Sequence, residues 1–264
     1  MIGTEHSTER TGAEPANARI LIVTGGSRGI GFHVARLAAC QGWQVAVGYH
    51  RHRPELDHSQ PWSRSIHPIE LDVRDPASQS SFFAQAEQTL GRPSALVTSA
   101  GIDRGAIPIE RITHEDLTET FAVNTIGLIT SCSEFVRRAA LSHGGNGGVI
   151  VNVSSMAATI GGRRHKTIYA ATKAAVDAFT IGAAKELARE AIRVFSVRPG
   201  MTRTDMTAEV LSDPDTAAAI RATIACGREA TVEEIAEPIL DLLSGRFAYA
   251  SGSTFNLSGG GFVL

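Results

Sequence analysis

Short apolar runs recur along the chain and alternate with longer segments whose apolar residues have a helical spacing. A short apolar run bounded by turn residues predicts a buried strand, and the longer periodic segments predict helices. The predicted strands cover residues 20–24, 44–49, 66–71, 95–99, 148–153, 192–197 and 253–257. This alternation predicts an α/β fold of the doubly wound Rossmann type, a parallel sheet of about seven strands in a three-layer α/β/α arrangement.

The chain has 264 residues, enough for one large α/β domain. Residues 1–18 are polar and show no apolar periodicity, so we expect a disordered arm followed by a single domain over residues 19–264. Residues 203–228 interrupt the alternation directly after the sixth predicted strand. Ligands bind at the carboxyl ends of strands in doubly wound sheets, so we predict that residues 203–228 form a mobile substrate lid.

The charge balance is close to neutral, with a net charge of −2 and a pI near 6.5. Such a balance favours small-molecule partners over nucleic acid or an anionic membrane. Cys40, Cys132 and Cys226 lack the spacing of metal ligands, so we expect no metal site and buried free thiols in a reducing compartment. There is no signal-peptide pattern and no apolar run long enough for a membrane span, which predicts a soluble cytoplasmic protein.

A glycine-rich turn follows the first predicted strand. The apolar run of residues 20–23 leads into Thr24-Gly-Gly-Ser-Arg-Gly-Ile-Gly31, and a helical pattern then extends to Cys40. Glycines let the backbone turn tightly and approach a dinucleotide, while free N–H groups at a helix start donate hydrogen bonds to a pyrophosphate. Glycines also serve plain turns, but between a strand and a helix they predict a dinucleotide site.

Tyr169 and Lys173 are four positions apart, which places them on one face of a helix about one turn from each other. An ammonium beside a phenol favours the phenolate, so we expect Lys173 to lower the pKa of Tyr169 from its usual value of about 10 toward the working pH. The pair predicts a general acid and base. The alternative is an ordinary helix with one amphipathic and one charged residue.

These two motifs make the chain similar to the classical short-chain dehydrogenase/reductase family. The turn of residues 24–31 fits the family pattern TGxxxGxG, and Tyr169 with Lys173 fits YxxxK. One departure is Thr98-Ser99, which stands where the family has two asparagines. The resemblance covers the chain from about Arg19 onward and is closest to 3-oxoacyl-carrier-protein reductase-like and sugar-dehydrogenase-like members. Further landmarks follow in family order: Asp72-Val73, Ala100-Gly101, Asn124, Ser154-Ser155 and Pro199-Gly200-Met-Thr-Arg-Thr204.

The resemblance implies a nicotinamide cofactor. In NAD-binding members an acidic residue after the second strand binds the ribose, whereas a basic residue accepts the 2′-phosphate of NADP. Here Arg51 follows that strand and Arg28 lies in the glycine turn, so we predict NADP(H), the alternative being a solvated basic loop. Asp72 is expected at the adenine edge or, alternatively, as a turn cap. The expected cofactor-binding residues are Gly25, Ser27, Arg28, Gly29, Ile30, Gly31, Arg51, Asp72, Val73, Ala100, Gly101, Tyr169, Lys173, Pro199, Gly200, Thr202 and Thr204.

By the same resemblance the catalytic residues are Asn124, Ser155, Tyr169 and Lys173. Tyr169 would exchange a proton with the substrate oxygen while hydride moves to or from the nicotinamide, and Ser155 would donate a hydrogen bond to that oxygen. Lys173 would also bind the nicotinamide ribose, and Asn124 would bend its helix and hold a water that links Lys173 to solvent. Ser154 competes for the serine role, but Ser155 has the spacing to Tyr169 that is usual in the family.

The resemblance implies a ketone or secondary alcohol as the substrate, with 3-oxoacyl and sugar-like compounds left open. The cationic run of residues 161–166 would attract an anionic substrate or an acyl carrier protein, aided by Arg137, Arg138 and Arg189, or would be a solvated loop. An idle NADP-binding sensor or scaffold and a dehydratase or epimerase are the alternative functions. Family members commonly form homotetramers, and we expect the small residues of 170–175 and the apolar end Phe262-Val263-Leu264 to be buried against other subunits.

Overall fold

The computed structural model describes residues 19–261. The predicted arm of residues 1–18 and the apolar end Phe262-Val263-Leu264 lie outside these described residues. No helix within the described part is long and apolar enough to cross a membrane.

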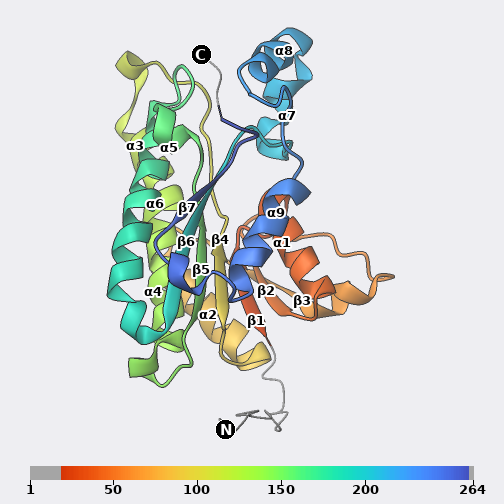
Figure 1. The fold of residues 1–264 in the computed structure, drawn as a ribbon, viewed down its shortest axis with the longest axis vertical. Helices are drawn as coiled ribbons and strands as arrows, with labels where there is room; N and C mark the ends of the chain where they lie inside the picture. Colours follow the sequence, from red (N-terminus) through yellow and green to blue (C-terminus); the bar gives the residue numbers. More distant parts are fainter. Residues whose placement is uncertain (1–18, 262–264) are drawn as a thin grey trace, which may run out of the picture.

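Seven parallel strands form one sheet in the order β3-β2-β1-β4-β5-β6-β7 (Figure 1). The predicted fold class and strand number are confirmed, and no predicted strand boundary differs from the observed one by more than two residues. The largest difference is in β6, which continues to Pro199. The strands are β1 Ile20–Thr24, β2 Gln44–Tyr49, β3 Ile66–Glu70, β4 Ala95–Thr98, β5 Gly148–Val153, β6 Ile192–Pro199 and β7 Thr254–Leu257.

Helices cover both faces of the sheet, because side chains alternate between the faces along every buried strand. Leu21 and Val23 of β1 join a core formed with helices α1 and α9, whereas Ile22 joins the core beneath α2, α4 and α6 (Figure 1). The α-helices are α1 Gly29–Cys40, α2 Pro76–Leu90, α3 His114–Phe121, α4 Leu128–Ala139, α5 Ala157–Ile160, α6 Thr167–Glu186, α7 Asp205–Ser212, α8 Pro214–Ala222 and α9 Glu233–Leu243.

Shorter helical turns connect these elements. A π-helical segment, η3, spans Ala122–Gly127 and joins α3 to α4. The 3₁₀ turns are η1 Pro61–Ser65, η2 Ile109–Arg111, η4 Leu141–His143, η5 Ala188–Glu190 and η6 Ala248–Ala250.

The strand order reverses at β1, whose last residue Thr24 pairs with Gly48 of β2 on one side and Thr98 of β4 on the other. In doubly wound sheets such a reversal opens a crevice at the carboxyl ends of the strands. Helices α7 and α8 follow β6 at this same edge and project beyond the layers (Figure 1). They form most of the predicted lid of residues 203–228.

The three cysteines are all free, as expected, but only Cys132 is buried. Cys40, at the end of α1, and Cys226, after α8, are exposed, so the prediction of buried thiols is wrong for these two. Cys40 is the last residue of α1, and Cys226 lies in the loop after the projecting helix α8.

Candidate functional site

One elongated cleft at the carboxyl edge of the sheet contains nearly all the predicted site residues. Its volume is about 560 Å³, which is within the range usual for small-molecule sites. It extends from the end of β2 near Arg51 to Tyr169 and Lys173 on α6. All the predicted cofactor-binding residues line it except Gly31, and so do all the predicted catalytic residues except Asn124.

The glycine turn after β1 is shaped by close backbone packing. Gly25 has φ +66°, and a Cβ added there would lie 2.5 Å from the Cα atom of Ala100 in the loop after β4. A Cβ at Gly31 would lie 2.5 Å from the carbonyl oxygen of Gly25. Gly31 therefore lets α1 pack against the turn and does not itself face the cleft.

The first turn of α1 is suited to a pyrophosphate. The helix begins at Gly29 after Arg28, with no side-chain cap and no acidic residue in its first turn. Its first N–H groups have no acceptor within the helix and carry the positive end of the helix dipole. Thr204 lies next to this turn, since its Cγ2 atom would be 3.7 Å from a Cβ at Gly29. These features fit a dinucleotide.

At the β2 end of the cleft, basic residues predominate. Arg28 and Arg51 both line this end, together with His50, His52 and Arg74, which the sequence analysis did not select. The exposed Arg28 guanidinium lies 3.4 Å from the Asp205 carboxylate on α7. No sequence motif identifies the two histidines and Arg74 as site residues. They are connected to the site only because the fold brings them to this end of the cleft.

Asp72 faces this end of the cleft but is already paired. Its carboxylate accepts hydrogen bonds from Arg74 at 2.9 and 2.7 Å, and His50 lies 3.5 Å away. The Arg74 hydrogen bond, more than the nearby charges, lowers the pKa of Asp72 to about 2. The carboxylate is therefore ionised at neutral pH and largely neutralised by Arg74, so it opposes a cofactor phosphate less than a free carboxylate would.

Tyr169 and Lys173 lie one turn apart on α6, and both face the cleft. The Nζ atom of Lys173 is 5.7 Å from the centre of the Tyr169 ring and donates a hydrogen bond to the Val153 carbonyl at 2.8 Å. Lys173 is 4% exposed, so a long cationic side chain is held almost fully out of water at the end of β5. Burial on this scale is costly and is typical of functional sites.

Burial controls the pKa values of both groups. It raises the pKa of Tyr169 to about 12, although a hydrogen bond with Ser155 acts in the opposite direction, and it lowers the pKa of Lys173 to about 8. The predicted lowering of the tyrosine pKa by Lys173 is therefore wrong for the protein alone. The cost of burying a phenolate exceeds the attraction of an ammonium near its ring.

The structure separates the roles of the two neighbouring serines. The Ser154 hydroxyl is buried and donates a hydrogen bond to the Lys173 carbonyl at 3.0 Å, which links β5 to α6. The Ser155 hydroxyl accepts a hydrogen bond from the Ala157 amide at 3.1 Å and also bonds to the Tyr169 side chain. This arrangement supports Ser155 as the serine that faces a substrate oxygen.

Asn124 lies behind the cleft rather than in its wall. It is fully buried in the π-helical segment η3, at the position where a helix bend was expected. Its side chain accepts a hydrogen bond from the Ile102 amide at 2.8 Å and donates to the Ile102 carbonyl at 2.9 Å. Asn124 therefore holds the loop after β4, where Ala100 and Gly101 line the cleft.

The loop after β6 forms another part of the cleft wall, next to the glycine turn. Pro199, Gly200, Thr202 and Thr204 all line the cleft, as expected. The Thr202 hydroxyl donates to the Gly200 carbonyl at 3.1 Å, and Thr204 caps the start of α7. Met206 of α7 extends this wall toward the predicted lid.

The cationic run of residues 161–166 is partly neutralised. Lys166 donates a hydrogen bond to the Asp103 carboxylate at 2.7 Å, and the Ile107 amide donates to the His165 carbonyl at 2.9 Å. These bonds join the loop before α6 to the loop after β4, near Tyr169. Asp103 also acts with burial to raise the pKa of Tyr169.

The expected contribution of Arg137, Arg138 and Arg189 to this run is wrong. Arg137 and Arg138 lie at the end of α4, and Arg189 lies in η5 just before β6, so all three are at the amino edge of the sheet. Helix α4 runs away from the carboxyl edge of the sheet and returns the chain to the start of β5 at the amino edge (Figure 1).

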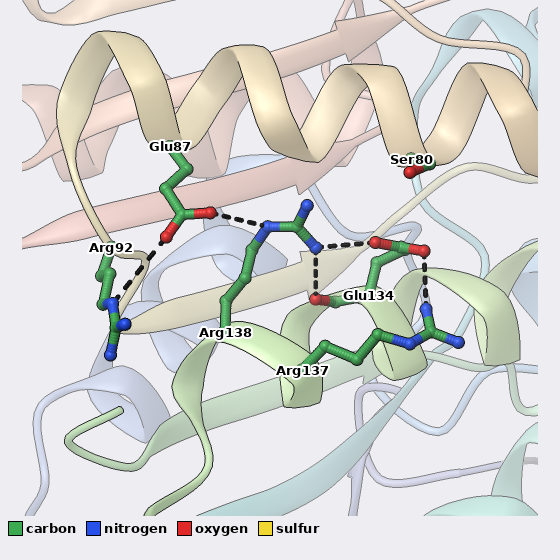
Figure 2. Close-up of a pocket in the computed structure, with 6 residues that line it drawn as sticks. All are labelled: Ser80, Glu87, Arg92, Glu134, Arg137 and Arg138. Carbon is green, nitrogen blue, oxygen red and sulfur yellow. Dashed lines mark hydrogen bonds and ion pairs between the residues drawn. The ribbon is translucent and has the colours of Figure 1, made fainter. Parts of the chain in front are cut away.

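Arg137 and Arg138 instead belong to what we name the α2–α4 charge cluster, Glu87, Arg92, Glu134, Arg137 and Arg138 (Figure 2). Arg138 binds Glu87 at 3.1 Å and Glu134 at 2.6 Å, and Arg137 binds Glu134 at 2.6 Å. Each arginine in this cluster has a carboxylate partner within ion-pair distance.

Comparison with known proteins gives consistent matches over almost the whole chain. A family model described as enoyl-(acyl carrier protein) reductase matches residues 25–261. The uncharacterized oxidoreductase YgfF of Escherichia coli (strain K12) is 36% identical over 245 residues, which cover 91% of this chain and 99% of the relative. L-xylulose reductase of Bos taurus is 33% identical over 244 residues, covering 92% of this chain and 96% of the relative.

Among solved structures, the short-chain dehydrogenase/reductase from Serratia marcescens BCRC 10948 superimposes with a TM-score of 0.82 at 26% identity. The match covers 94% of this chain and 99% of that one.

Proposed function

Because the chain belongs to the classical short-chain dehydrogenase/reductase family and is an NAD(P)-dependent oxidoreductase acting on CH–OH and C=O groups, we propose that it is an NADP(H)-dependent carbonyl reductase and alcohol dehydrogenase. The observation that supports this proposal best is the convergence of Ser155, Tyr169 and Lys173 in a cleft that continues past the first turn of α1 to Arg28 and Arg51.

The proton transfer is assigned to Tyr169. Its phenol donates a proton to the substrate oxygen in reduction and takes it back in oxidation, while Ser155 donates a hydrogen bond to the same oxygen. The bound nicotinamide supplies or accepts the hydride. Lys173, held by Val153 at 2.8 Å, places its ammonium close to the tyrosine ring and is positioned to bind a ribose hydroxyl.

Burial raises the pKa of Tyr169, so during turnover another interaction must offset the cost of forming a buried phenolate. With a pKa of about 8, Lys173 is mostly protonated at neutral pH, and its attraction for a phenolate strengthens when water is excluded. We therefore propose that closing the cleft strengthens the coupling between Tyr169 and Lys173. Asn124 contributes by holding the Ile102 backbone, and the proposed water between it and Lys173 would carry protons to solvent.

The preference for NADP(H) rests on Arg28 and Arg51. Guanidinium groups bind a phosphate through paired hydrogen bonds, and both side chains face the β2 end of the cleft. Asp72 is the carboxylate that the family resemblance places near the cofactor. It is paired with Arg74, so it repels a cofactor phosphate less than an unpaired carboxylate would.

For the substrate we propose a ketone or secondary alcohol of the 3-oxoacyl or sugar-like class. The family model is described by an acyl-carrier-protein substrate, and one relative is named for a sugar, L-xylulose. We also propose that α7 and α8 act as its lid and that the enzyme is a cytoplasmic homotetramer. Light scattering and cell fractionation test the last two proposals.

The decisive experiment is a panel of ketones and alcohols, including 3-oxoacyl thioesters and sugars, incubated with the wild-type protein and NADPH or NADH. We expect NADPH oxidation with one alcohol formed per cofactor consumed. Cofactor binding without turnover on any compound would favour an idle sensor. Product formation with no net change in cofactor would favour a dehydratase or epimerase.

A further inference from the structure

Glu229 is a buried carboxylate outside the catalytic cleft, in the loop between α8 and α9. Its side chain is 4% exposed and accepts hydrogen bonds from two arginines. Arg203 donates to it at 2.6 Å, and Arg221 donates at 2.7 and 3.0 Å in a paired arrangement. A buried carboxylate needs such partners, because water no longer stabilises its charge.

The two arginines come from opposite ends of the helical segment that we propose as the lid. Arg203 precedes α7, and Arg221 lies in the last turn of α8. Their side chains are 73% and 40% exposed, so either guanidinium would remain solvated without the carboxylate. Glu229 therefore joins the two ends of the segment that runs from Arg203 to Arg221. The two guanidinium groups do not themselves require burial, so the carboxylate holds these ends together.

In the sequence, Arg203 also lies between Thr202 and Thr204, two residues that line the cleft and that we expect to bind the cofactor. Its amide donates to the Ala230 carbonyl at 2.9 Å, and the Ala230 amide donates to Met201 at 2.9 Å. The loop after β6 is therefore bound to the loop of Glu229 by its backbone as well as its side chain.

Helix α8 has a different kind of attachment. It projects from the layered body beside α7 (Figure 1). Within residues 19–261, the pair between Arg221 and Glu229 is the only ion pair made by α8. Helix α8 also packs through its buried residues Ala217 and Ile220, and Glu229 is the carboxylate that links it to the loop after β6.

We propose that Glu229 is a positioning residue that couples the loop of Thr202 and Thr204 to helix α8, so that cofactor binding at this loop orders the lid. This inference rests on the proposed function for the identity of the cofactor and the lid. A displacement of the Thr202–Thr204 loop moves Arg203, the shared carboxylate follows, and Arg221 transmits the change to α8.

The link is constant over the working pH range. Hydrogen bonds from Arg221 and Arg203 hold the pKa of Glu229 well below its usual range. The titratable and charged groups around it are Arg203, Arg221 and the neighbouring Arg228, which pairs with Glu234. Arginine side chains stay protonated across the working pH range, so the coupling does not act as a pH switch.

The test compares Glu229→Gln with Glu234→Gln. Glutamine is nearly isosteric but uncharged, and the two arginines left unpaired at Glu229 are exposed enough to be solvated. Glu234→Gln removes a second, exposed arginine pair, that of Arg228 at 2.6 and 2.8 Å. Arg228 also donates to the Glu229 carbonyl at 3.2 Å, but within residues 19–261 neither Arg228 nor Glu234 forms a hydrogen bond or ion pair with α8 or with residues 202–204. Glu234→Gln is therefore the matched control.

The measurement is hydrogen exchange of peptides covering residues 214–222, with and without whichever of NADPH or NADH the wild-type protein binds more tightly. In the wild type and in Glu234→Gln we expect the cofactor to slow exchange in α8. In Glu229→Gln we expect exchange without cofactor to be faster by about tenfold, the loss of one charge-assisted interaction, and the cofactor effect on α8 to disappear.

Equal protection of α8 by cofactor in Glu229→Gln and in the wild type would overturn the proposal, as would a wild-type α8 that does not respond to cofactor. Arg221→Gln provides a second variant, because it leaves Glu229 paired with Arg203, and it should also lose the response. The readout requires cofactor binding but no turnover. An absence of ketone reduction by the wild type would therefore refute the proposed function without deciding this coupling.

Discussion

Two groups of ionisable side chains in this molecule are organised in opposite ways. In the α2–α4 charge cluster, Arg138 binds two carboxylates, Glu87 and Glu134 (Figure 2). Its guanidinium also lies over the Phe83 ring. At the catalytic end of the cleft, the buried ammonium of Lys173 donates to the Val153 carbonyl and lies beside an uncharged phenol. The ions of the α2–α4 charge cluster pair with one another. The Lys173 ammonium is instead left able to interact with a bound cofactor or substrate.

The difference shows what separates a structural cluster from a reactive one. Paired ions neutralise one another, so their protonation changes little near neutral pH and they act mainly on packing. In the cleft, burial moves the pKa of Lys173 down to about 8, although the Asp177 carboxylate acts in the opposite direction, and it moves that of Tyr169 up to about 12. Groups perturbed in this way respond strongly to a bound cofactor or substrate.

The largest expected effect is at Tyr169. Tyr169→Phe removes the proton donor but keeps the ring, so we expect kcat to fall at least about a hundredfold while cofactor affinity stays nearly unchanged. Steady-state kinetics and a fluorescence titration with NADPH measure the two quantities. Turnover near the wild-type rate would show that the proton comes from another group.

Lys173→Met should abolish most activity and also weaken cofactor binding, because the same ammonium acts on the tyrosine and on the ribose. It should also change the dependence of stability on pH. The folded-state pKa of Lys173 is lower than its usual value of about 10.5, so the unfolded chain binds more protons between pH 8 and about 10. The contribution of Lys173 to the free energy of unfolding should therefore rise with pH in this window.

Urea unfolding of the wild type and of Lys173→Met at pH 7, 8 and 9 measures this contribution as the difference in free energy of unfolding between the two proteins, which should rise by on the order of 1 kcal/mol. The difference is needed because burial also raises the pKa of the Cys132 thiol, so its ionisation in the unfolded chain lowers the stability of both proteins as the pH rises. A difference that is flat or falls from pH 7 to 9 would show that Lys173 is not held in a perturbed state.

The cofactor preference should depend on the two arginines at the β2 end. Arg28→Ala combined with Arg51→Asp should lower NADPH affinity by about tenfold or more and leave NADH affinity within about twofold, since only NADPH has the 2′-phosphate. Fluorescence titrations with both cofactors measure this change. Unaltered NADPH affinity would assign the phosphate to other groups, with His50, His52 and Arg74 the nearest candidates.

The smallest effect on activity is expected in the α2–α4 charge cluster. Glu134→Gln leaves Arg138 and Arg137 short of a partner, so we expect a loss of about 1–3 kcal/mol in the free energy of unfolding with kcat nearly unchanged. Asp241→Asn, which breaks an exposed pair with Arg246, is the control and should change neither. A loss of kcat in folded Glu134→Gln would mean that the two regions are not independent.

Much of the fold follows from local sequence. Each buried strand is a short apolar run bounded by turn residues, so the strands of the sheet were located within two residues of their observed ends. The glycine turn of residues 24–31 and the four-residue spacing of Tyr169 and Lys173 are also local, and both identify chemistry that the tertiary structure brings into one cleft.

Properties that depend on the balance of long-range contacts could not be predicted in this way. The pKa of Tyr169 is set by how much water the fold removes from it, which the spacing to Lys173 does not report. Arg137 and Arg138 lie close in sequence to catalytic elements, yet the direction of α4 takes them to the other edge of the sheet.

The sequence by itself determined the family, the order of the strands along the chain and the candidate residues for proton exchange. Only the tertiary structure decided which charges are paired. Asp103 meets Lys166 across 63 positions, and Glu229 joins Arg203 and Arg221 from the two ends of a helical segment. Electrostatic interactions act through space and depend on burial, so a linear pattern of charged residues does not specify them.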